Sequence, residues 1–291
     1  MQRERQEVEL LDAADPSSFT YAAPSDPPLK RAIIQSVEAM TGQRTLRDIY
    51  MEYRRDTEDA DTFWTNAVKR LHLDVRYNPE GLERIPKDGP VVIVANHPYG
   101  VIDGIVLAWL MERVRSDFKI LVNSVLARAE EARPYLLPID FAATKSAMKM
   151  NLQSRADARE MLDKGQMVVV FPGGTVSTAV TPFGRAWDPE WKPFTARLIS
   201  RGNATVVPIF FDGQNSRLFQ LASLAHPTLR LALFFHEARN KMHRPVKLTI
   251  GEPLSPAALP AGDPVALIAE LRRRTYALGN IEDAVVAPTQ P

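Results

Sequence analysis

Short apolar runs and longer helical patterns alternate along the chain from about residue 73 onward. Apolar runs of strand length occur at 73–77, Val91–Ala95, 118–122, 136–141, 167–171, 205–211, 231–235 and 246–250. Helical patterns lie between or after them at 145–164, 191–201 and 265–278. Alternation of this kind is typical of a mostly parallel central sheet flanked by helices. We therefore predict an α/β domain over residues 76–283.

A helical segment over residues 29–75 precedes this domain, with amphipathic patterns at 29–40, 45–55 and 62–73. These helices are expected to cap the core, and the alternative is that they offer a basic and aromatic face, including Phe63 and Trp64, to a bilayer surface. Residues 1–28 and 284–291 are polar or rich in proline, so both are expected to form flexible tails.

Composition narrows the classes of function. The 291 residues are 45% hydrophobic and carry a formal net charge of +1, so no general affinity for nucleic acid is expected. The chain has no cysteine, which excludes disulfides, thiolate metal sites and cysteine nucleophiles. Its N-terminus lacks the apolar core of a secretory signal, and the most apolar window is interrupted by Asn96, His97, Pro98 and Asp103. Any membrane contact is therefore expected to be peripheral.

The segment after the strand Val91–Ala95 carries the first candidate chemistry. His97 follows the strand directly, and Asp103 stands where the next helix should begin. Open α/β sheets place functional groups at the carboxyl ends of their strands. A carboxylate can accept a hydrogen bond from one ring nitrogen of a histidine and leave the other free to accept a proton. His97 and Asp103 are thus predicted to be catalytic, although a purely structural turn is the alternative.

A glycine pair follows another apolar run and forms the second candidate element. Phe171–Ser177 reads FPGGTVS, so backbone N–H groups near Gly173 and Gly174 can approach a phosphate or an oxyanion without obstruction by side chains. No Gly-Lys-Ser/Thr follows as in a Walker loop, and no G-x-S-x-G serine-hydrolase elbow occurs.

Together, the two elements resemble the motifs of the glycerolipid acyltransferases, the family of 1-acyl-glycerol-3-phosphate and lysophospholipid acyltransferases. Asn96 and His97 match the first motif, with Asp103 six residues after the histidine instead of five and Gly100 placed to absorb the insertion. Phe171–Ser177 matches the third motif Phe-Pro-Glu-Gly-Thr-Arg-Ser, with Gly173 in place of Glu and Val176 in place of Arg. The form NHPYGVIDG is similar to a haemolysin-like bacterial branch, and the resemblance covers roughly residues 76–255.

The resemblance implies transfer of a fatty acyl group from acyl-CoA or acyl carrier protein to the hydroxyl of a lysophospholipid or a lyso-ornithine or other lyso-aminolipid. His97 would be the general base and Asp103 would orient it, with no metal and no cofactor beyond the donor. Donor, acceptor or oxyanion binding is implied for Asn96, Gly100, Pro172, Gly173, Gly174, Thr175 and Ser177. Such an enzyme would act peripherally on the cytoplasmic face of a bacterial inner membrane and would bind no nucleic acid.

The family's second motif ends in Asp-Arg, whereas this chain has Asp140 followed by Phe141. Since Phe cannot clamp a phosphate, either one of the candidate cations Lys145, Arg185, Lys192 and Arg197 replaces that Arg, or the head group of the acceptor is not a simple phosphate monoester. For each of these four residues, a solvated surface charge is the alternative. A lipid hydrolase and a catalytically silent lipid- or carrier-binding protein remain the alternatives. A pore-forming toxin is disfavoured because no spanning pattern is present.

Overall fold

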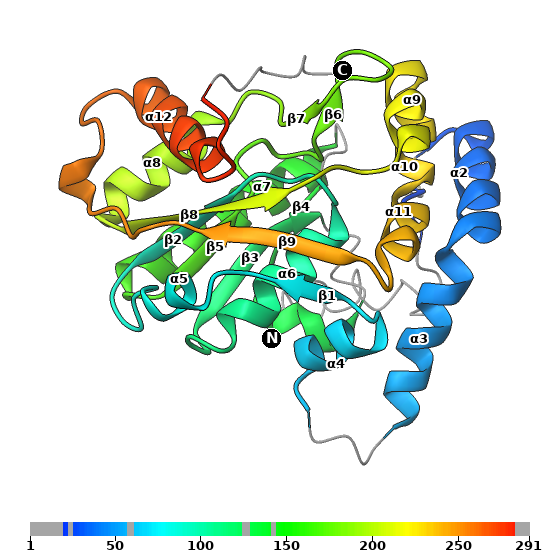
Figure 1. The fold of residues 1–291 in the computed structure, drawn as a ribbon, viewed down its shortest axis with the longest axis horizontal. Helices are drawn as coiled ribbons and strands as arrows, with labels where there is room; N and C mark the ends of the chain where they lie inside the picture. The colour runs from blue at the N-terminus through cyan, green and yellow to red at the C-terminus, as the bar shows by residue number, and fades with distance from the viewer. Residues whose placement is uncertain (1–19, 23–25, 57–60, 124–128, 141–143, 283–291) are drawn as a thin grey trace.

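A seven-stranded sheet in the order β1-β9-β8-β2-β5-β3-β4 forms the centre of the molecule (Figure 1). The computed structural model describes residues 20–22, 26–56, 61–123, 129–140 and 144–282. The strands are β1 Asp74–Arg76, β2 Val91–Ala95, β3 Phe118–Asn123, β4 Leu136–Ile139, β5 Met167–Val170, β8 Thr205–Asp212 and β9 Pro245–Ile250. Only the β8–β9 pairing is antiparallel within this sheet, so the predicted mostly parallel architecture is confirmed.

The central strand β2 is buried on both faces, as its uninterrupted apolar sequence predicts. Val91, Ile93 and Ala95 face one core, and Val92 and Val94 face the other. The first core is covered by α4 (Phe63–Arg70) and α6 (Val101–Met111). The second is covered by α7 (Lys145–Asp163), α8 (Pro193–Gly202) and α12 (Pro264–Ala277). The sheet is therefore flanked by helices on both sides.

The N-terminal helices α2 (Pro28–Thr41) and α3 (Gln43–Arg55) lie along the right of the view in Figure 1, beside α10 (Pro227–Ala232) and α11 (Phe234–Lys241). Trp64 of α4 is only 5% exposed and belongs to the first core. The prediction that these helices cap the core is thus confirmed for α4, and the alternative of an outward aromatic face is wrong for Trp64.

The expected N-terminal tail is partly ordered. The Thr20 hydroxyl donates a hydrogen bond to the Glu38 carboxylate of α2, and the backbone N–H of Tyr21 donates to the same group at 2.7 Å. Ala22 is buried against Ile34. Glu38 thus holds residues 20–22 of the predicted tail on α2, while residues 1–19, 23–25, 284–291 and Phe141 lie outside the described residues.

The apolar run 231–235, predicted to be a strand, is helical. It contains the end of α10 (Pro227–Ala232) and the start of α11 (Phe234–Lys241). Pro227 occupies the first turn of α10 and the His226 ring nitrogen Nδ1 accepts from the N–H of Thr228, so the helix start is well defined. The leucine and phenylalanine side chains fill clusters against α2 and α9 (Arg217–Ala225) instead of joining the sheet.

The remaining elements are short. They are α5 (Pro79–Glu83), the 3-10 helices η2 (Glu130–Tyr135) and η3 (Pro256–Ala258), and the small antiparallel pair β6 (Thr178–Ala179) and β7 (Ala186–Trp187). Among the helices of the described residues, none combines the length and the apolar character needed to span a membrane.

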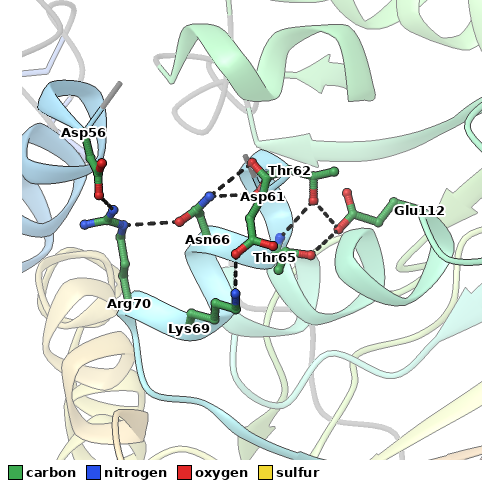
Figure 2. A network of polar contacts seen from close by, with 8 residues as sticks. All are labelled: Asp56, Asp61, Thr62, Thr65, Asn66, Lys69, Arg70 and Glu112. Carbon is green, nitrogen blue, oxygen red and sulfur yellow. Dashed lines mark hydrogen bonds and ion pairs between the residues drawn. The ribbon is translucent and has the colours of Figure 1, made fainter. Parts of the chain in front are cut away.

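A polar network fixes α4 against the end of α6 (Figure 2). The hydroxyls of Thr62 and Thr65 donate to the Glu112 carboxylate at 2.7 and 3.0 Å. Arg70 donates to Asp56, at the end of α3, at 2.6 Å. Because these contacts join α3, α4 and α6, they hold α3 and α4 over the first core.

Candidate active site

The carboxyl ends of β2, β5 and β8 lie side by side, because β2 pairs with both of the other strands. The Asn96 side chain joins two of these ends. Its Nδ2 donates to the carbonyl of Phe211 at 2.9 Å and its Oδ1 accepts from the N–H of Phe211 at 2.7 Å. Both ends of the amide are therefore engaged by the backbone of β8, which fixes the segment that carries the next residue, His97.

His97 and Asp103 meet as the sequence predicts. His97 Nδ1 lies 2.9 Å from Asp103 Oδ2. Asp103 is fully buried, whereas the His97 side chain keeps 17% of its surface exposed. The carboxylate is thus placed to hold the Nδ1–H tautomer, which leaves Nε2 as the proton acceptor.

The turn before α6 organises Asp103 as well as the histidine. The carboxylate oxygen Oδ2 also accepts from the backbone N–H groups of Tyr99 at 2.8 Å and Gly100 at 3.1 Å. Gly100 has φ of +72°, a conformation that costs glycine little. Burial raises the pKa of Asp103 above its ordinary value, although the bonds from His97, Tyr99 and Gly100 oppose this. An acid in the first turn of a helix is also favoured by the helix dipole.

The glycine-containing loop lies against the histidine. The Phe171 ring stacks on the His97 ring, with centroids 4.0 Å apart, and the N–H of Ser177 donates to the His97 carbonyl at 2.8 Å. Gly174 has φ of +73° and its N–H donates to the Phe171 carbonyl, so this amide closes the turn. Among the described residues, the N–H groups of Gly173, Thr175 and Val176 have no acceptor. They are therefore the amides of this loop that remain available to an oxyanion.

Asp188 is a residue of this site that no motif in the sequence singles out. It is fully buried, and its Oδ1 accepts from the His97 N–H at 3.1 Å and from the Ser177 hydroxyl at 2.5 Å. Its Oδ2 accepts from the Trp191 indole at 2.8 Å. Burial raises the pKa of Asp188, and these donors oppose the shift. One carboxylate thus joins the histidine segment, the glycine-containing loop and the start of α8.

The two positions that depart from the third motif are both enclosed. A Cβ at Gly173 would lie 3.3 Å from the Pro189 ring and 3.5 Å from the Asp188 Cβ, so a Glu side chain there would displace its neighbours. Asp188 places a carboxylate in the same region. Val176 is 4% exposed and packs with Phe219 in an apolar cluster. The position of the family's Arg is therefore part of the core in this chain.

The predicted anion-binding cations do not converge. Lys192 adjoins the glycine-containing loop, since its backbone N–H donates to the Pro172 carbonyl at 2.9 Å. Arg197 is exposed one turn further along α8, and Lys145 is exposed at the start of α7. Arg185 lies over the Trp187 ring at 5.3 Å from its centroid. Only Lys192 is thus linked to the loop by a bond.

Lys241, at the end of α11, is a further cation beside the histidine turn. Its Nζ lies 3.6 Å from the centroid of the Tyr99 ring. Burial lowers the pKa of Lys241, and the nearby Asp103 carboxylate opposes that shift. Lys241 comes from a segment predicted to be next to a strand, so nothing in the sequence connects it to His97.

An apolar cavity of about 160 Å³ opens beside the first turns of α6. Its walls come from α3, α4, α6, β3 and α11, and include Ile49, Phe63, Ile105, Val122 and Phe235. Gly104, the residue after Asp103, also lines it, and a Cβ at Gly104 would meet no atom within 4 Å. Ile102 and Gly104, on either side of Asp103 in α6, thus line the cavity, whereas His97 and Asp103 do not.

These features agree with what is found in known proteins. A family model described as acyltransferase matches residues 44–285, and the chain therefore belongs to this acyltransferase family. The family predicted from the motifs at His97 and Phe171–Ser177 is thereby confirmed.

Two curated relatives carry the name lyso-glycine lipid O-acyltransferase. The protein of Phocaeicola vulgatus is 29% identical over 195 residues, which cover 62% of this chain and 65% of the relative. The protein of Bacteroides thetaiotaomicron is 28% identical over 195 residues, which cover 62% of this chain and 67% of the relative. The chain thus spans about two thirds of the length of the curated relatives it matches.

Among solved structures, the 1-acyl-sn-glycerophosphate acyltransferase PlsC of Thermotoga maritima is similar, with a TM-score of 0.49 and 18% sequence identity. The superposition covers 86% of this chain and 87% of that one.

Proposed function

We propose that this protein is a lysolipid O-acyltransferase, which moves a fatty acyl group from a thioester donor to a lipid hydroxyl. The observation that carries the proposal is the His97–Asp103 pair, with Nδ1 and Oδ2 2.9 Å apart at the carboxyl end of β2. A half-buried imidazole with its tautomer fixed by a buried carboxylate is suited to accept a proton from an alcohol.

In the proposed reaction, His97 Nε2 accepts the proton of the acceptor hydroxyl as its oxygen attacks the thioester carbonyl. Asp103 stabilises the imidazolium that results. The tetrahedral intermediate then collapses, its carbon–sulfur bond breaks, and the departing thiolate takes the proton from His97. One ester bond forms and one thioester bond breaks, so no acyl-enzyme, metal or further cofactor is required.

The loop at Gly173 supports the stabilisation of negative charge in this reaction. The N–H groups of Gly173 and Thr175 are available, and the loop is attached to His97 through Ser177 and Phe171. Backbone donors held in place before the reaction stabilise an oxyanion without reorganising. Asn96, Pro172 and Asp188 would act by fixing the segments that carry these groups, because their polar atoms already bind other parts of the protein.

The acyl chain of the donor would occupy the apolar cavity beside α6. The walls of this cavity are mostly aliphatic and aromatic, and they include Ile102 and Gly104, the two neighbours of Asp103 in the chain. Burial of methylene groups contributes about 0.8 kcal/mol each.

The acceptor proposed is a lyso-aminolipid, the class to which the names of the two curated relatives point. Val176 replaces the motif Arg inside an apolar cluster, so a strong clamp for a phosphate monoester is missing at that position. The donor would be acyl-CoA or acyl carrier protein, and the enzyme would work peripherally on the cytoplasmic face of the inner membrane.

Product analysis with labelled donor tests this function. Purified protein and its His97→Ala variant would be given acyl-CoA or acyl carrier protein with lyso-glycine lipid, lyso-ornithine lipid or lysophosphatidic acid. We expect labelled diacyl product from a lyso-aminolipid with the natural protein and none with the variant. Release of free fatty acid without acceptor would favour a hydrolase, and donor binding without any turnover would favour a silent binding protein; either result would overturn the proposal.

A further inference from the structure

The outward face of α9 is apolar. Leu218, Leu221 and Leu224 are 53%, 44% and 37% exposed, and Arg217 is the only charged residue of the helix. A helix on the surface of a soluble protein usually turns polar side chains to water. This face therefore has the character of a binding surface.

The turn between β6 and β7 continues this apolar surface. Phe183 is 81% exposed and Val180 is 39% exposed. Arg217 donates a hydrogen bond to the Gly184 carbonyl at 2.9 Å, and the N–H of Ala179 donates to Gln220 Oε1 at 2.8 Å. Figure 1 shows the turn above β6 and β7 beside α9. The turn and the helix are thus fastened together, and we call Val180, Phe183, Leu218, Leu221 and Leu224 the apolar rim.

The charge around the apolar rim is positive. Residues 213–236 and 176–187 contain no Asp or Glu. Arg185 and Arg217 are both exposed at the rim. Apolar side chains with arginine beside them and no acidic residue fit the boundary between the headgroups and acyl chains of an anionic bilayer.

The apolar rim begins at the active-site loop. Ser177, whose N–H donates to the His97 carbonyl, directly precedes β6. A membrane in contact with the rim would therefore lie close to His97. The N-terminal helices, in contrast, place Trp64 inside the core.

We propose that the apolar rim docks this protein on an anionic lipid bilayer and thereby brings the lipid acceptor from the membrane to His97. This inference rests on the proposed function, since it is a lipid acceptor that gives docking its purpose. Phe183 and the leucines insert among the acyl chains, while Arg185 and Arg217 contact anionic headgroups.

Vesicle binding tests the docking surface without catalysis. The full chain carrying His97→Ala would be mixed with vesicles of equal parts phosphatidylglycerol and phosphatidylethanolamine, and bound protein measured by sedimentation. Adding Phe183→Ser and Leu221→Ser should lower the partition coefficient by about tenfold or more. The matched control is Val265→Ser, since Val265 is 57% exposed on α12 at the far end of the sheet in Figure 1, and it should bind as before.

An unchanged partition coefficient in the double variant, or an equal loss in Val265→Ser, would overturn the inference. So would intact vesicle binding with a rise in KM for acyl carrier protein, which would assign the rim to a protein partner. When His97 is retained, Phe183→Ser with Leu221→Ser should lower the rate of transfer to acceptor in vesicles by about tenfold. The rate of transfer to the same acceptor in detergent micelles should stay unchanged. If the protein bound vesicles but transferred no acyl group to acceptor in vesicles or in micelles, the proposed function would be contradicted. The docking surface would still be supported.

Discussion

At the scale of single residues, the His97 ring is held by contacts from separate parts of the chain. Asp103 binds Nδ1, and the Phe171 ring stacks on the imidazole. The backbone on either side is held by Asp188 and Ser177. Because catalytic efficiency depends on placement within fractions of an ångström, residues that never touch substrate should still affect the rate.

Asp188 is the clearest of these positioning residues. Asp188→Asn would turn one accepting oxygen into a donor, which cannot satisfy the N–H of His97, the Ser177 hydroxyl and the Trp191 indole together. We expect kcat for acyl transfer to fall by about a hundredfold and KM for the donor to change little. Glu190→Gln, at an exposed neighbouring position, is the control and should leave kcat as it is. Equal kcat in Asp188→Asn and the natural protein would contradict the positioning role.

Substitution of Gly100 should destabilise the protein through both the backbone conformation and a side-chain contact. Its φ of +72° disfavours any side chain, and a Cβ would lie 3.3 Å from the Val176 side chain. We expect Gly100→Ala to lower the free energy of unfolding by more than about 1 kcal/mol and to reduce transfer. Gly89→Ala, at φ of +70° with no atom within 4 Å, isolates the backbone cost. Thermal unfolding would measure both, and equal losses in the two variants would show that the contact with Val176 is unimportant.

Much of the site at this scale could be predicted from sequence, because His97, Asp103 and the glycine pair lie in two short segments with recognisable spacing. Asp188 and Lys241 could not. Each acts through a contact formed only on folding, and a lone Asp before Pro189 or a lone Lys at the end of a helix resembles many surface residues.

At the scale of elements, α3 and α4 give the cavity its outer wall. The network around Glu112 and Arg70 fixes these helices to α6 (Figure 2), and Phe63 lines the cavity between them. The segment expected to cap the core thus also shapes the space proposed for the acyl chain. The cap itself was predictable from amphipathic spacing, whereas the cavity depends on how elements distant in sequence meet.

The glycine at position 104 offers a direct test of this space. Gly104→Leu would add a side chain to a helix residue that lines the cavity and has no atom near its Cβ position. We expect kcat/KM for long acyl donors to fall by about tenfold relative to short ones. Gly104→Ala is the control, since one methyl group should leave chain preference unchanged and favour the helix by up to about 1 kcal/mol. If Gly104→Leu kept the chain-length preference of the natural protein, the cavity would not be the binding site of the acyl chain.

The apolar run 231–235 shows why one predicted strand was wrong. Short apolar runs suit a buried strand and a buried helix equally, so periodicity alone does not decide between them. Pro227, at the first turn of α10, was the available signal for a helix. Packing against α2 and α9 then determines which side chains are buried.

At the scale of the whole molecule, the strand order creates the site. β5 lies between β2 and β3, and β8 lies on the other side of β2, so the segments after three strands meet at one edge. Their alternation with helices predicts a mostly parallel sheet, and this was confirmed. The antiparallel β9 and the β6–β7 pair were not predictable in the same way, because strand direction and pairing depend on contacts distant in sequence.

The most direct measurement is the pH dependence of kcat/KM for acyl transfer by the natural protein, His97→Ala and Asp103→Asn. A general base must be unprotonated to accept the proton, so transfer by the natural protein should fall toward acid pH. His97→Ala should be slower by about a thousandfold and lose that acid limb, while Asp103→Asn should be slower because the tautomer is no longer fixed. A flat profile in the natural protein, or an acid limb that persists unchanged in His97→Ala, would contradict the assignment of His97 as the base.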